Sequence, residues 1–240
     1  MTPRAAAGRA APRILVTGAC GNLGRAVTRR FAAEGARLVL LDREAPALQA
    51  LRAEDHAHQL TLAADLTDAA AVQAAVDAAA EAHGGIDVLC NLAGGFRMGP
   101  PVHQTSGADW DFLMDLNVRS LLHTARAVVP RMLEAGGGHI VNVGAAGAAR
   151  GAAGMGAYAA AKTAVARLTE SMAAELHAGG IHVNCVQPTI LDTPENRAAM
   201  PGADASRWVR LEDLAEVVAF LCSPAARAIQ GACIPVAGHG

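Results

Sequence analysis

The sequence predicts an α/β fold: a doubly wound parallel sheet of seven strands, ordered 3-2-1-4-5-6-7, with helices on both faces. Two observations support this prediction. Short, nearly continuous apolar runs alternate with Ala-rich amphipathic stretches along the chain, and an unbroken apolar run is typical of a parallel strand that is covered on both sides. Alternating strands and helices then join through right-handed crossovers into one parallel sheet.

The expected elements follow each other in a regular order. Strands are predicted at residues 13–17, 37–41, 59–63, 86–91, 139–143, 181–186 and 232–236. Helices are predicted between them at 23–34, 45–53, 68–83, 109–135, 155–178 and 211–222. Two irregular segments, 94–107 and 189–210, are longer than a simple connection needs. Both follow strand C-termini, where open α/β sheets bind ligands, and we expect them to form the walls of a substrate pocket.

The length of 240 residues suits a single domain, which we expect at residues 13–240. Residues 1–12 are mostly Ala, Arg and Pro, which favours a disordered extension over a transit peptide. The sequence contains no run of about 18 apolar residues, so we predict no membrane span. The formal net charge of −2 and the scattered charges argue against nucleic acid or an anionic membrane as a partner. A small-molecule substrate is the partner that we expect.

The cysteines and histidines show no pattern of a disulfide framework or a metal site. The five cysteines form no CxxC pair, which favours packed, reduced thiols in a cytoplasmic protein. The nine histidines lack the spacings of metal ligands. We therefore predict a cytoplasmic protein without a metal cofactor.

The first predicted strand runs directly into three glycines spaced three apart, and a predicted helix follows them. This spacing gives a tight turn and lets the backbone approach a pyrophosphate, which the free N–H groups of the helix N-terminus bind. A strand, such a turn and a helix together predict a Rossmann-type dinucleotide site. The residues expected at this turn are Gly18, Gly21, Asn22, Leu23 and Gly24.

Asp42 ends the second predicted strand, 18 residues beyond Gly24. A carboxylate there can accept hydrogen bonds from both adenosine ribose hydroxyls and repels a 2′-phosphate, so it favours NAD(H) over NADP(H). Arg43 follows directly and leaves NADP(H) open, because an arginine can pair with that phosphate. Asp65, at the end of the third strand, is expected beside the adenine, or alternatively as a cap of the next helix.

Lysine and tyrosine each occur once in this chain. Of the 20 basic residues, 19 are arginine, and the single lysine, Lys162, stands four positions after the single tyrosine, Tyr158. Residues at positions i and i+4 share one face of a helix. A lysine retained where all the other basic residues are arginine points to a role that arginine cannot fill, so we predict that Tyr158 and Lys162 carry the chemistry.

From residue 13 onward the chain resembles the short-chain dehydrogenase/reductase family. The matching residues are the glycine-rich turn, Asp65-Leu66, Asn91-Leu-Ala93-Gly94, Asn117 in Asp-Leu-Asn-Val, Tyr158-Ala-Ala-Ala-Lys162 and Pro188-Thr-Ile190-Leu-Asp-Thr193. The resemblance implies that Tyr158 donates or accepts the proton, that Lys162 holds the nicotinamide ribose and that Asn117 anchors a water of the proton relay. It also implies that the segment from Pro188 to Thr193 contacts the nicotinamide amide.

The expected chemistry of the pair agrees with this assignment. A free phenol has a pKa of about 10. A neighbouring ammonium and a positively charged nicotinamide both favour the phenolate, so we expect the pKa of Tyr158 to be lowered. An arginine would keep the charge but not the compact geometry of an ammonium group.

One position departs from the family pattern. The family carries a serine 13 residues before the tyrosine, where this chain has Ala145, and no Ser or Thr occurs from 139 to 157. The quinonoid dihydropteridine reductases, a subset of the family, share this alanine, and the chain resembles them in three further stretches. These are Gly154-Met155-x-x-Tyr158, Leu191-Asp-Thr-Pro-Glu-Asn-Arg197 and Met200-Pro-Gly-Ala-Asp-Ala-Ser-Arg-Trp208.

That resemblance implies a substrate pocket lined by Phe96, Ala145, Met155 and Trp208. Phe96 is expected to stack on a flat heterocycle, although it can equally be a loop residue packed into the core. The retained Asn117 and the segment from Arg97 to Pro101 differ from the pterin enzymes.

Three functions are compatible with the missing serine. In the first, hydride passes to a conjugated C=N or quinonoid heterocycle such as a dihydropterin, which spreads the developing charge and needs no serine. In the second, the chain is a carbonyl reductase or alcohol dehydrogenase in which water or another loop donor replaces the serine. In the third, it binds NAD(H) without turnover, as a sensor or an assembly subunit.

The predicted long helices at 109–135 and 155–178 are rich in small residues that suit close helix packing. The family pairs these helices across a two-fold axis, so the resemblance implies a homodimer or homotetramer. Packing of both helices within a monomer is the alternative.

Overall fold

The computed structural model describes residues 11–53 and 59–238 of the chain. Most of the predicted N-terminal extension, residues 1–10, lies outside the described residues. Just before the first strand, the carbonyl oxygen of Pro12 accepts a hydrogen bond from the backbone N–H of Arg37.

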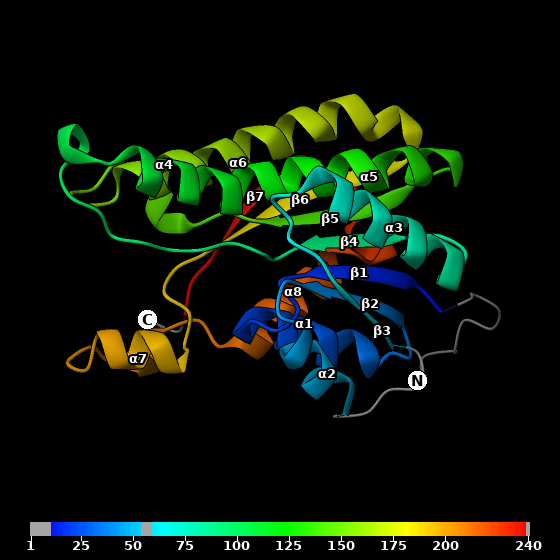
Figure 1. Cartoon of the computed structure of the whole chain (residues 1–240), viewed down its shortest axis with the longest axis horizontal. Coiled ribbons are helices and arrows are strands. Elements are labelled where there is room, and N and C mark those ends of the chain that lie inside the picture. The colour runs from blue at the N-terminus through cyan, green and yellow to red at the C-terminus, as the bar shows by residue number, and fades with distance from the viewer. Residues whose placement is uncertain (1–10, 54–58, 239–240) are drawn as a thin grey trace.

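A single seven-stranded parallel sheet forms the centre of the molecule, and its order is β3-β2-β1-β4-β5-β6-β7, as predicted (Figure 1). The strands are β1 (Arg13–Thr17), β2 (Arg37–Asp42), β3 (Gln59–Ala63), β4 (Val88–Asn91), β5 (Gly138–Val143), β6 (Ile181–Pro188) and β7 (Cys233–Val236). The order reverses between β1 and β4, and the C-terminal ends of the strands at such a switch point form the usual ligand crevice.

Helices cover both faces of the sheet (Figure 1). The helices on one face are α1 (Asn22–Ala32), α2 (Ala45–Ala53) and α8 (Leu211–Leu221), and those on the other are α3 (Ala69–His83), α5 (Ser120–Glu134) and α6 (Gly156–Leu176). Two further helices, α4 (Gly107–Met114) and α7 (Pro194–Ala199), project beyond the strand ends. No helix within the described ranges combines the length and the apolar character that crossing a bilayer requires.

The hydrophobic core has two layers because the strands carry apolar side chains on both faces. Val16, Leu38 and Val186 pack on the side of α1 and α8, while Leu15 and Val183 pack on the side of α3 and α5. This arrangement explains why the strands lack a polar alternation in the sequence.

The fourth strand starts two residues later than predicted, at Val88 instead of residue 86. Asp87, just before the strand, is hydrogen-bonded to Arg13. Its carboxylate accepts the Arg13 backbone N–H at 2.8 Å and the Arg13 side-chain Nε–H at 2.9 Å. Asp87 therefore joins the starts of two adjacent strands from outside the ladder.

The predicted helix at 109–135 is divided. A π-helical turn over Asp115–Arg119 separates α4 from α5. Such turns are rare and frequently mark functional sites. This turn contains Asn117, and its wider backbone shifts the side chains of α4 relative to those of α5.

The segment 189–210, predicted to be irregular, contains α7 and a 3-10 turn at Ala205–Arg207. The prediction was wrong here because the helix is only six residues long and has no apolar periodicity. Local signals were present, since the Thr193 hydroxyl accepts the Asn196 N–H at 3.2 Å as an N-cap and Pro194 occupies the first turn. The other segment, 94–107, is irregular apart from a short 3-10 turn at Val102–Gln104.

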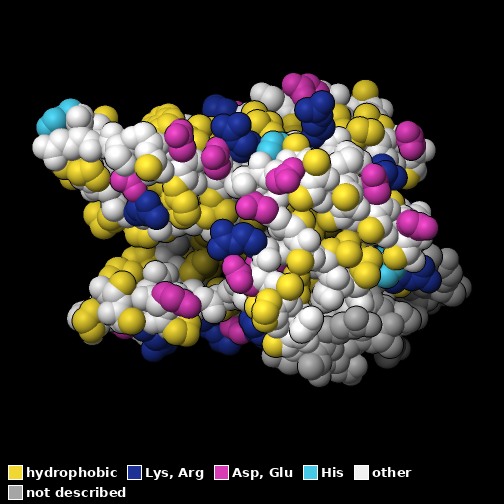
Figure 2. Space-filling model, viewed as in Figure 1, with side chains coloured by type: hydrophobic (Ala, Val, Ile, Leu, Met, Phe, Trp, Pro, Cys, Tyr) yellow, Lys and Arg dark blue, Asp and Glu magenta, His cyan; other side chains and the backbone are white. Residues whose placement is uncertain are grey.

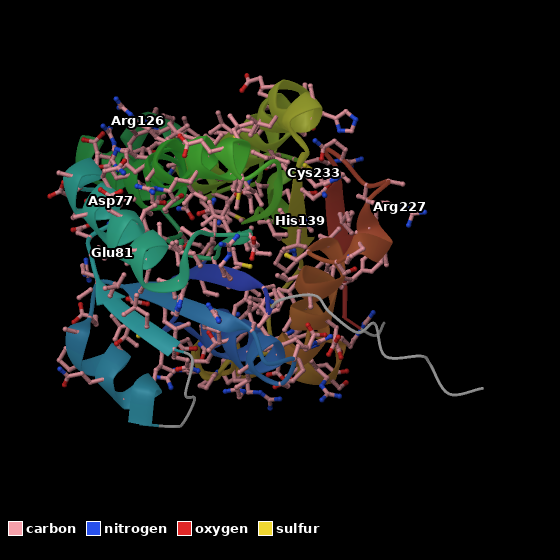
Figure 3. All side chains as sticks on the ribbon, turned by 90° about the vertical axis from the view of Figure 1, so that its right-hand side faces the viewer. Asp77, Glu81, Arg126, His139, Arg227 and Cys233 are labelled. Carbon is pink, nitrogen blue, oxygen red and sulfur yellow. The ribbon has the colours of Figure 1, made fainter. Side chains whose placement is uncertain are left out.

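The opposite end of the sheet, where the strands begin, is shown in Figure 3. Asp77 and Glu81 on α3 and Arg126 on α5 lie toward one side of this view, and His139 and Cys233 lie at the starts of β5 and β7. Asp77 forms an ion pair of 2.5 Å with Arg131. This end carries none of the site residues predicted from the sequence.

Candidate active site

A hollow opens at the C-terminal ends of the strands. Figure 2 shows it as a cleft between the part of the surface formed by α4 and the part formed by α7, with hydrophobic side chains around it. The segment 94–107 leads into α4 in one wall, and the segment 189–210 contains α7 in the other. The position of the cleft agrees with the ligand crevice expected for this sheet.

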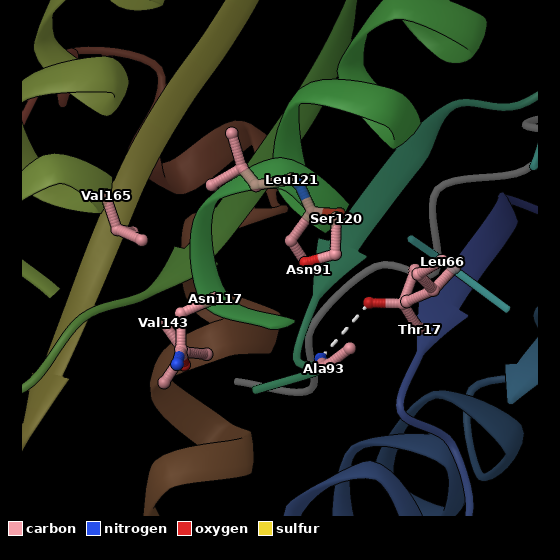
Figure 4. Close-up of a pocket in the computed structure, with 9 residues that line it drawn as sticks. All are labelled: Thr17, Leu66, Asn91, Ala93, Asn117, Ser120, Leu121, Val143 and Val165. Atoms are coloured by element: carbon pink, nitrogen blue, oxygen red, sulfur yellow. Dashed lines mark hydrogen bonds between the residues drawn. The ribbon is translucent and has the colours of Figure 1, made fainter. Parts of the chain in front are cut away.

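The glycine turn after β1 is built for close backbone approach. Gly18 has a φ of 64°, and a Cβ at this position would lie 2.9 Å from the backbone nitrogen of Ala93. A Cβ at Gly24 would overlap the carbonyl oxygen of Gly18. The Thr17 hydroxyl fixes the neighbouring loop by accepting hydrogen bonds from the N–H groups of Leu92 and Ala93, at 3.1 and 3.2 Å. Figure 4 shows the bond from Ala93.

The first turn of α1 keeps its backbone N–H groups available. Gly21 stands at the N-cap, and no side chain of the described residues caps the helix there. These N–H groups and the positive end of the helix dipole suit a phosphate group. Asn22 and Leu23 form the start of the helix beside it. The glycine turn thus fits the pyrophosphate of a dinucleotide.

Asp42 lies at the end of β2 and is fixed by two backbone groups. Its carboxylate accepts the N–H of Cys20 at 2.9 Å and the N–H of Arg43 at 2.7 Å. The Arg43 guanidinium is exposed and contacts Glu44 at 3.3 Å. The carboxylate is therefore held beside the glycine turn, where an adenosine ribose would need it.

Asp65 does not cap the next helix, and that alternative is wrong; its side chain instead stabilises the loop before the helix. Its carboxylate accepts the Thr67 N–H at 2.9 Å and the Thr67 hydroxyl at 2.7 Å. The backbone hydrogen bond has the larger effect of the two, and both lower the pKa of the Asp65 carboxyl group. The helix cap itself is Asp68, which accepts the N–H groups of Ala70 and Ala71.

A small pocket lies between the glycine turn and the π turn (Figure 4). It brings together four of the predicted site residues and five that were not singled out. The lining residues are Thr17, Leu66, Asn91, Ala93, Asn117, Ser120, Leu121, Val143 and Val165.

The side chain of Asn91 is committed to a buried hydrogen-bond network. Its amide donates to Asn142 Oδ1 at 2.9 Å, and its carbonyl oxygen accepts the Thr124 hydroxyl at 2.7 Å. Asn142 in turn donates to the Thr169 hydroxyl at 2.9 Å. Asn91 therefore contributes mainly its backbone to the cleft, and its side chain ties β4 to β5, α5 and α6.

Asn117 and Lys162 meet at Gly94. A Cβ on Gly94 would lie 2.8 Å from Asn117 Oδ1 and 3.1 Å from Lys162 Nζ. Asn117 holds the loop in both directions, because its oxygen accepts the Gly95 N–H and its amide donates to the Gly95 carbonyl, each at 3.1 Å. Lys162 Nζ donates to the carbonyl oxygen of Val143 at 2.9 Å.

Tyr158 lies one turn before Lys162 on α6, in the first turn of that helix. Its ring packs against Ala145, Ala148 and Ala159. The ring of Phe96 meets it edge to face, with 4.9 Å between centroids and an interplanar angle of 87°. The structure therefore brings Phe96, Ala145 and Tyr158 together.

The pKa of Tyr158 differs in direction from the expectation. Burial raises the pKa of the phenol, whereas the ammonium and a positively charged nicotinamide together are expected to lower it. Burial also lowers the pKa of the Lys162 ammonium to about 8. Both groups are desolvated, and desolvation favours the neutral form of each. The lysine hydrogen-bonds a backbone carbonyl, not the phenol, so its charge does not outweigh the burial of Tyr158.

The remaining predicted residues take different positions. Met155 stands at the N-cap of α6, and Pro188 ends β6. Ile190 is 42% exposed and Thr193 is buried as the cap of α7. Trp208 is only 6% exposed, so it presents little surface to a substrate, in contrast to its expected place in the pocket wall.

Two polar residues at the C-terminal ends of the strands were missed by the sequence interpretation. Arg97 lies over the ring of Phe112 at 4.2 Å and pairs with Asp109 at 2.5 Å, and both Arg97 and Asp109 line a pocket that reaches Tyr158. Gln187 lies on β6 beside Gly144. Its signal was present as a polar residue directly before Pro188, at the C-terminal end of a strand.

Within the described ranges, no three His, Cys, Asp or Glu residues gather in a way that could hold a metal ion.

Comparison with known proteins agrees with this geometry. The sequence model described as short chain dehydrogenase matches residues 12–203. D-threitol dehydrogenase of Mycolicibacterium smegmatis is 36% identical over 236 residues, which cover 93% of this chain and 90% of that protein. Levodione reductase of Leifsonia aquatica is 33% identical over 246 residues, covering 94% of this chain and 92% of that protein.

A solved structure shows the same fold. It is the 3-ketoacyl-(acyl-carrier-protein) reductase from Brucella melitensis complexed with NADH, with a TM-score of 0.83 and 32% identity over 93% of this chain and 95% of that one. The family match and the relatives span most of the chain. This chain is an oxidoreductase that belongs to the short chain dehydrogenase family.

Proposed function

We propose that this protein interconverts a small secondary alcohol and its ketone with NAD(H), and that Tyr158 supplies or takes up the proton. The observation that carries the proposal is the grouping of Tyr158, Lys162 and Asn117 beside the glycine turn. The relatives add support, since they include a dehydrogenase of the polyol threitol and a reductase of levodione.

The cleft offers complementary groups for each part of a dinucleotide. The glycine turn and the α1 N-terminus would hold the pyrophosphate, and Asp42 the adenosine ribose, which favours NAD(H) over NADP(H). The adenosine and the nicotinamide ribose would be bordered by Leu66, Ala93 and Gly94. The nicotinamide amide would contact the segment that contains Pro188, Ile190 and Thr193. When bound, the cofactor supplies the hydride.

Tyr158 handles the proton in this proposal. In ketone reduction, the phenol gives its proton to the carbonyl oxygen while hydride adds to the carbonyl carbon. The raised pKa of Tyr158 keeps the phenol protonated, which suits a proton donor. Lys162 and Asn117 fix the surroundings through the Val143 carbonyl and the Gly95 backbone.

A second candidate function is reduction of a conjugated C=N or quinonoid heterocycle such as a dihydropterin. Two observations favour it. Ala145 places a methyl group, not a hydroxyl, against Tyr158, and Phe96 is 59% exposed beside the phenol, where it can contact a flat ring. A substrate with delocalised charge needs no donor at position 145.

The two candidates predict different results in one assay, in which the loss of NADH absorbance is followed with quinonoid dihydropterin and with a panel of cyclic ketones and ketoses. We expect turnover of ketones. Turnover of dihydropterin alone would replace the first candidate by the second. Tight NADH binding without turnover of either class would instead support a non-catalytic sensor or assembly subunit.

We also propose that residues 13–240 act as one domain, within a homodimer or homotetramer in the cytoplasm. Leu122 and Leu133 on α5 are each 44% exposed, as is Trp110 on α4, so both helices present apolar surface. All five cysteines are free thiols, which suits a reducing compartment. Light scattering coupled to size exclusion would measure the assembly, and a monomer at micromolar concentration would contradict it.

A further inference from the structure

Gln187 places a polar side chain on a face of β6 whose preceding residues are apolar. On β6, Val183 and Cys185 face the side of α5 and α6 and are fully buried, and Gln187 follows two positions later on the same face. In the described part of the chain, the Gln187 side-chain amide has no hydrogen-bond partner. The residue is partly buried but its amide atoms are not fully enclosed, so the amide is free to bond a ligand that enters beside it.

Gly144 provides the space for this amide. A Cβ on Gly144 would lie 3.1 Å from Gln187 Cγ, 3.5 Å from Gln187 Nε2 and 3.0 Å from Cys185 Sγ. The φ of Gly144 is not in the left-handed region. The glycine is therefore needed for room, and its absent side chain lets Gln187 lie across the end of β5.

The end of β5 is also where the catalytic group is assembled. Val143, which precedes Gly144, accepts the hydrogen bond from Lys162 Nζ at 2.9 Å. Ala145, which follows Gly144, packs against Tyr158. Consecutive Cα atoms are about 3.8 Å apart. The amide of Gln187 thus lies against Gly144, the residue between the lysine contact and the Tyr158 contact.

The segment that precedes Tyr158 supplies no hydroxyl for this position. Residues 139–157 contain no Ser or Thr. The Thr163 hydroxyl, on α6 close to Tyr158, donates to the Ala148 carbonyl at 3.1 Å. Gln187 is the neutral side-chain donor that lies against the residue before Ala145, where the hydroxyl of residue 145 is missing.

We propose that the side-chain amide of Gln187 donates a hydrogen bond to the reacting oxygen of the substrate and thereby replaces the absent serine. This inference rests on the proposed ketone and alcohol chemistry. In reduction, the electron pair of the hydride from NADH forms the new C–H bond, and the carbonyl π pair moves to oxygen. That oxygen takes the Tyr158 proton. The Gln187 amide keeps its own proton and stabilises the charge that develops on the oxygen.

The test is Gln187→Leu in the full chain, measured with a ketone that the wild type reduces. Loss of one such donor typically costs about 10²- to 10³-fold in rate, and we expect kcat/KM to fall by that amount. The dissociation constant of NADH, followed by its fluorescence, and the melting temperature are expected to stay unchanged. Gln49→Leu, at an exposed position on α2, is the matched control and keeps full activity.

A second substitution tests the replacement directly. Adding Ala145→Ser to Gln187→Leu restores a donor beside Tyr158, and we expect it to recover at least tenfold of the lost kcat/KM. Gln187→Glu keeps the shape of the side chain without its donor at neutral pH. Its activity is expected to rise as the pH falls and the carboxyl group becomes protonated, a profile that a merely structural role would not produce.

The outcomes separate this inference from the proposed function. Wild-type kcat/KM in Gln187→Leu would overturn the role of Gln187 while leaving ketone reduction intact. Loss of NADH binding in Gln187→Leu would also overturn it, because the amide would then serve the cofactor. A wild-type protein that reduces no ketone would overturn the proposed function first, and the inference with it.

Discussion

The side-chain amide of Asn22 donates a 2.8 Å hydrogen bond to the carboxylate of Glu195, which joins two residues 173 positions apart in the sequence. Asn22 begins α1 at the expected phosphate site, and Glu195 lies in the first turn of α7. The pKa of the Glu195 carboxyl group is lowered by hydrogen bonds. The largest effect comes from its own backbone N–H, and smaller ones come from Thr193 and Asn22. The bond holds α7 against the start of α1.

We therefore predict that Glu195→Ala speeds the release of NADH. Without the bond to Asn22, α7 is held less firmly beside the bound dinucleotide, and lids of this kind often limit product release. Stopped-flow displacement of NADH is expected to give a dissociation rate raised severalfold. The exposed Glu212→Ala on α8 serves as the control, and an unchanged dissociation rate in Glu195→Ala would show that α7 does not retain the cofactor.

Lys162 predicts a pH dependence of stability. Its pKa is about 8 in the folded protein against an ordinary value of 10.5. Between these values the unfolded chain binds a proton that the folded protein does not, so the free energy of unfolding rises with pH in this window. The contribution is at most about 1.4 kcal/mol per pH unit.

The measurement compares urea unfolding of the wild type and Lys162→Met at several pH values across that window. Because other groups titrate in both proteins, only the difference between the two free energies reports on Lys162. We expect this difference to shift in favour of the wild type as the pH rises. Parallel curves would mean that the ammonium is not desolvated.

Asp42 is predicted to select the cofactor. Its carboxylate is fixed by the N–H groups of Cys20 and Arg43 and would repel a 2′-phosphate. Asp42→Ala removes that charge and leaves Arg43 nearby, so the ratio of kcat/KM for NADH over NADPH is expected to fall by about tenfold or more. A wild type that already prefers NADPH would contradict this assignment.

The buried network below the site is predicted to be a source of stability. Thr169→Val leaves the amide of Asn142 without its acceptor, and an unsatisfied buried donor costs about 1–3 kcal/mol. Thermal unfolding is expected to show a melting temperature lowered by several degrees, while Thr169→Ser, which keeps the hydroxyl, loses less. Equal losses in the two variants would indicate that the methyl group, and not the hydrogen bond, is what matters.

Much of the fold could be predicted from the sequence because parallel strands covered on both faces are uniformly apolar. Six of the seven strands start within a residue or so of the expected position. β4 was the exception, since Ile86 is as apolar as the strand itself but lies before the contact of Asp87 with Arg13. An apolar sequence indicates that a segment is buried, but it does not indicate at which residue the hydrogen bonds between two strands begin.

The local geometry of the site was harder to predict. The π turn around Asn117 leaves no mark in composition, and α7 is too short to have a helical period. The raised pKa of Tyr158 depends on its burial among Ala145, Ala148 and Ala159, which only the packing shows. Gln187 was overlooked because its meaning comes from its contact with Gly144, which follows the neighbouring strand β5.

The central claim is that the phenol of Tyr158 transfers the proton during hydride transfer. Tyr158→Phe removes only the hydroxyl group, and the Phe96 contact and the alanine packing around the ring are kept. Single-turnover oxidation of bound NADH by a ketone substrate measures the step directly. We predict a rate lowered by about 10²-fold or more with NADH affinity unchanged. A rate equal to that of the wild type would contradict the account.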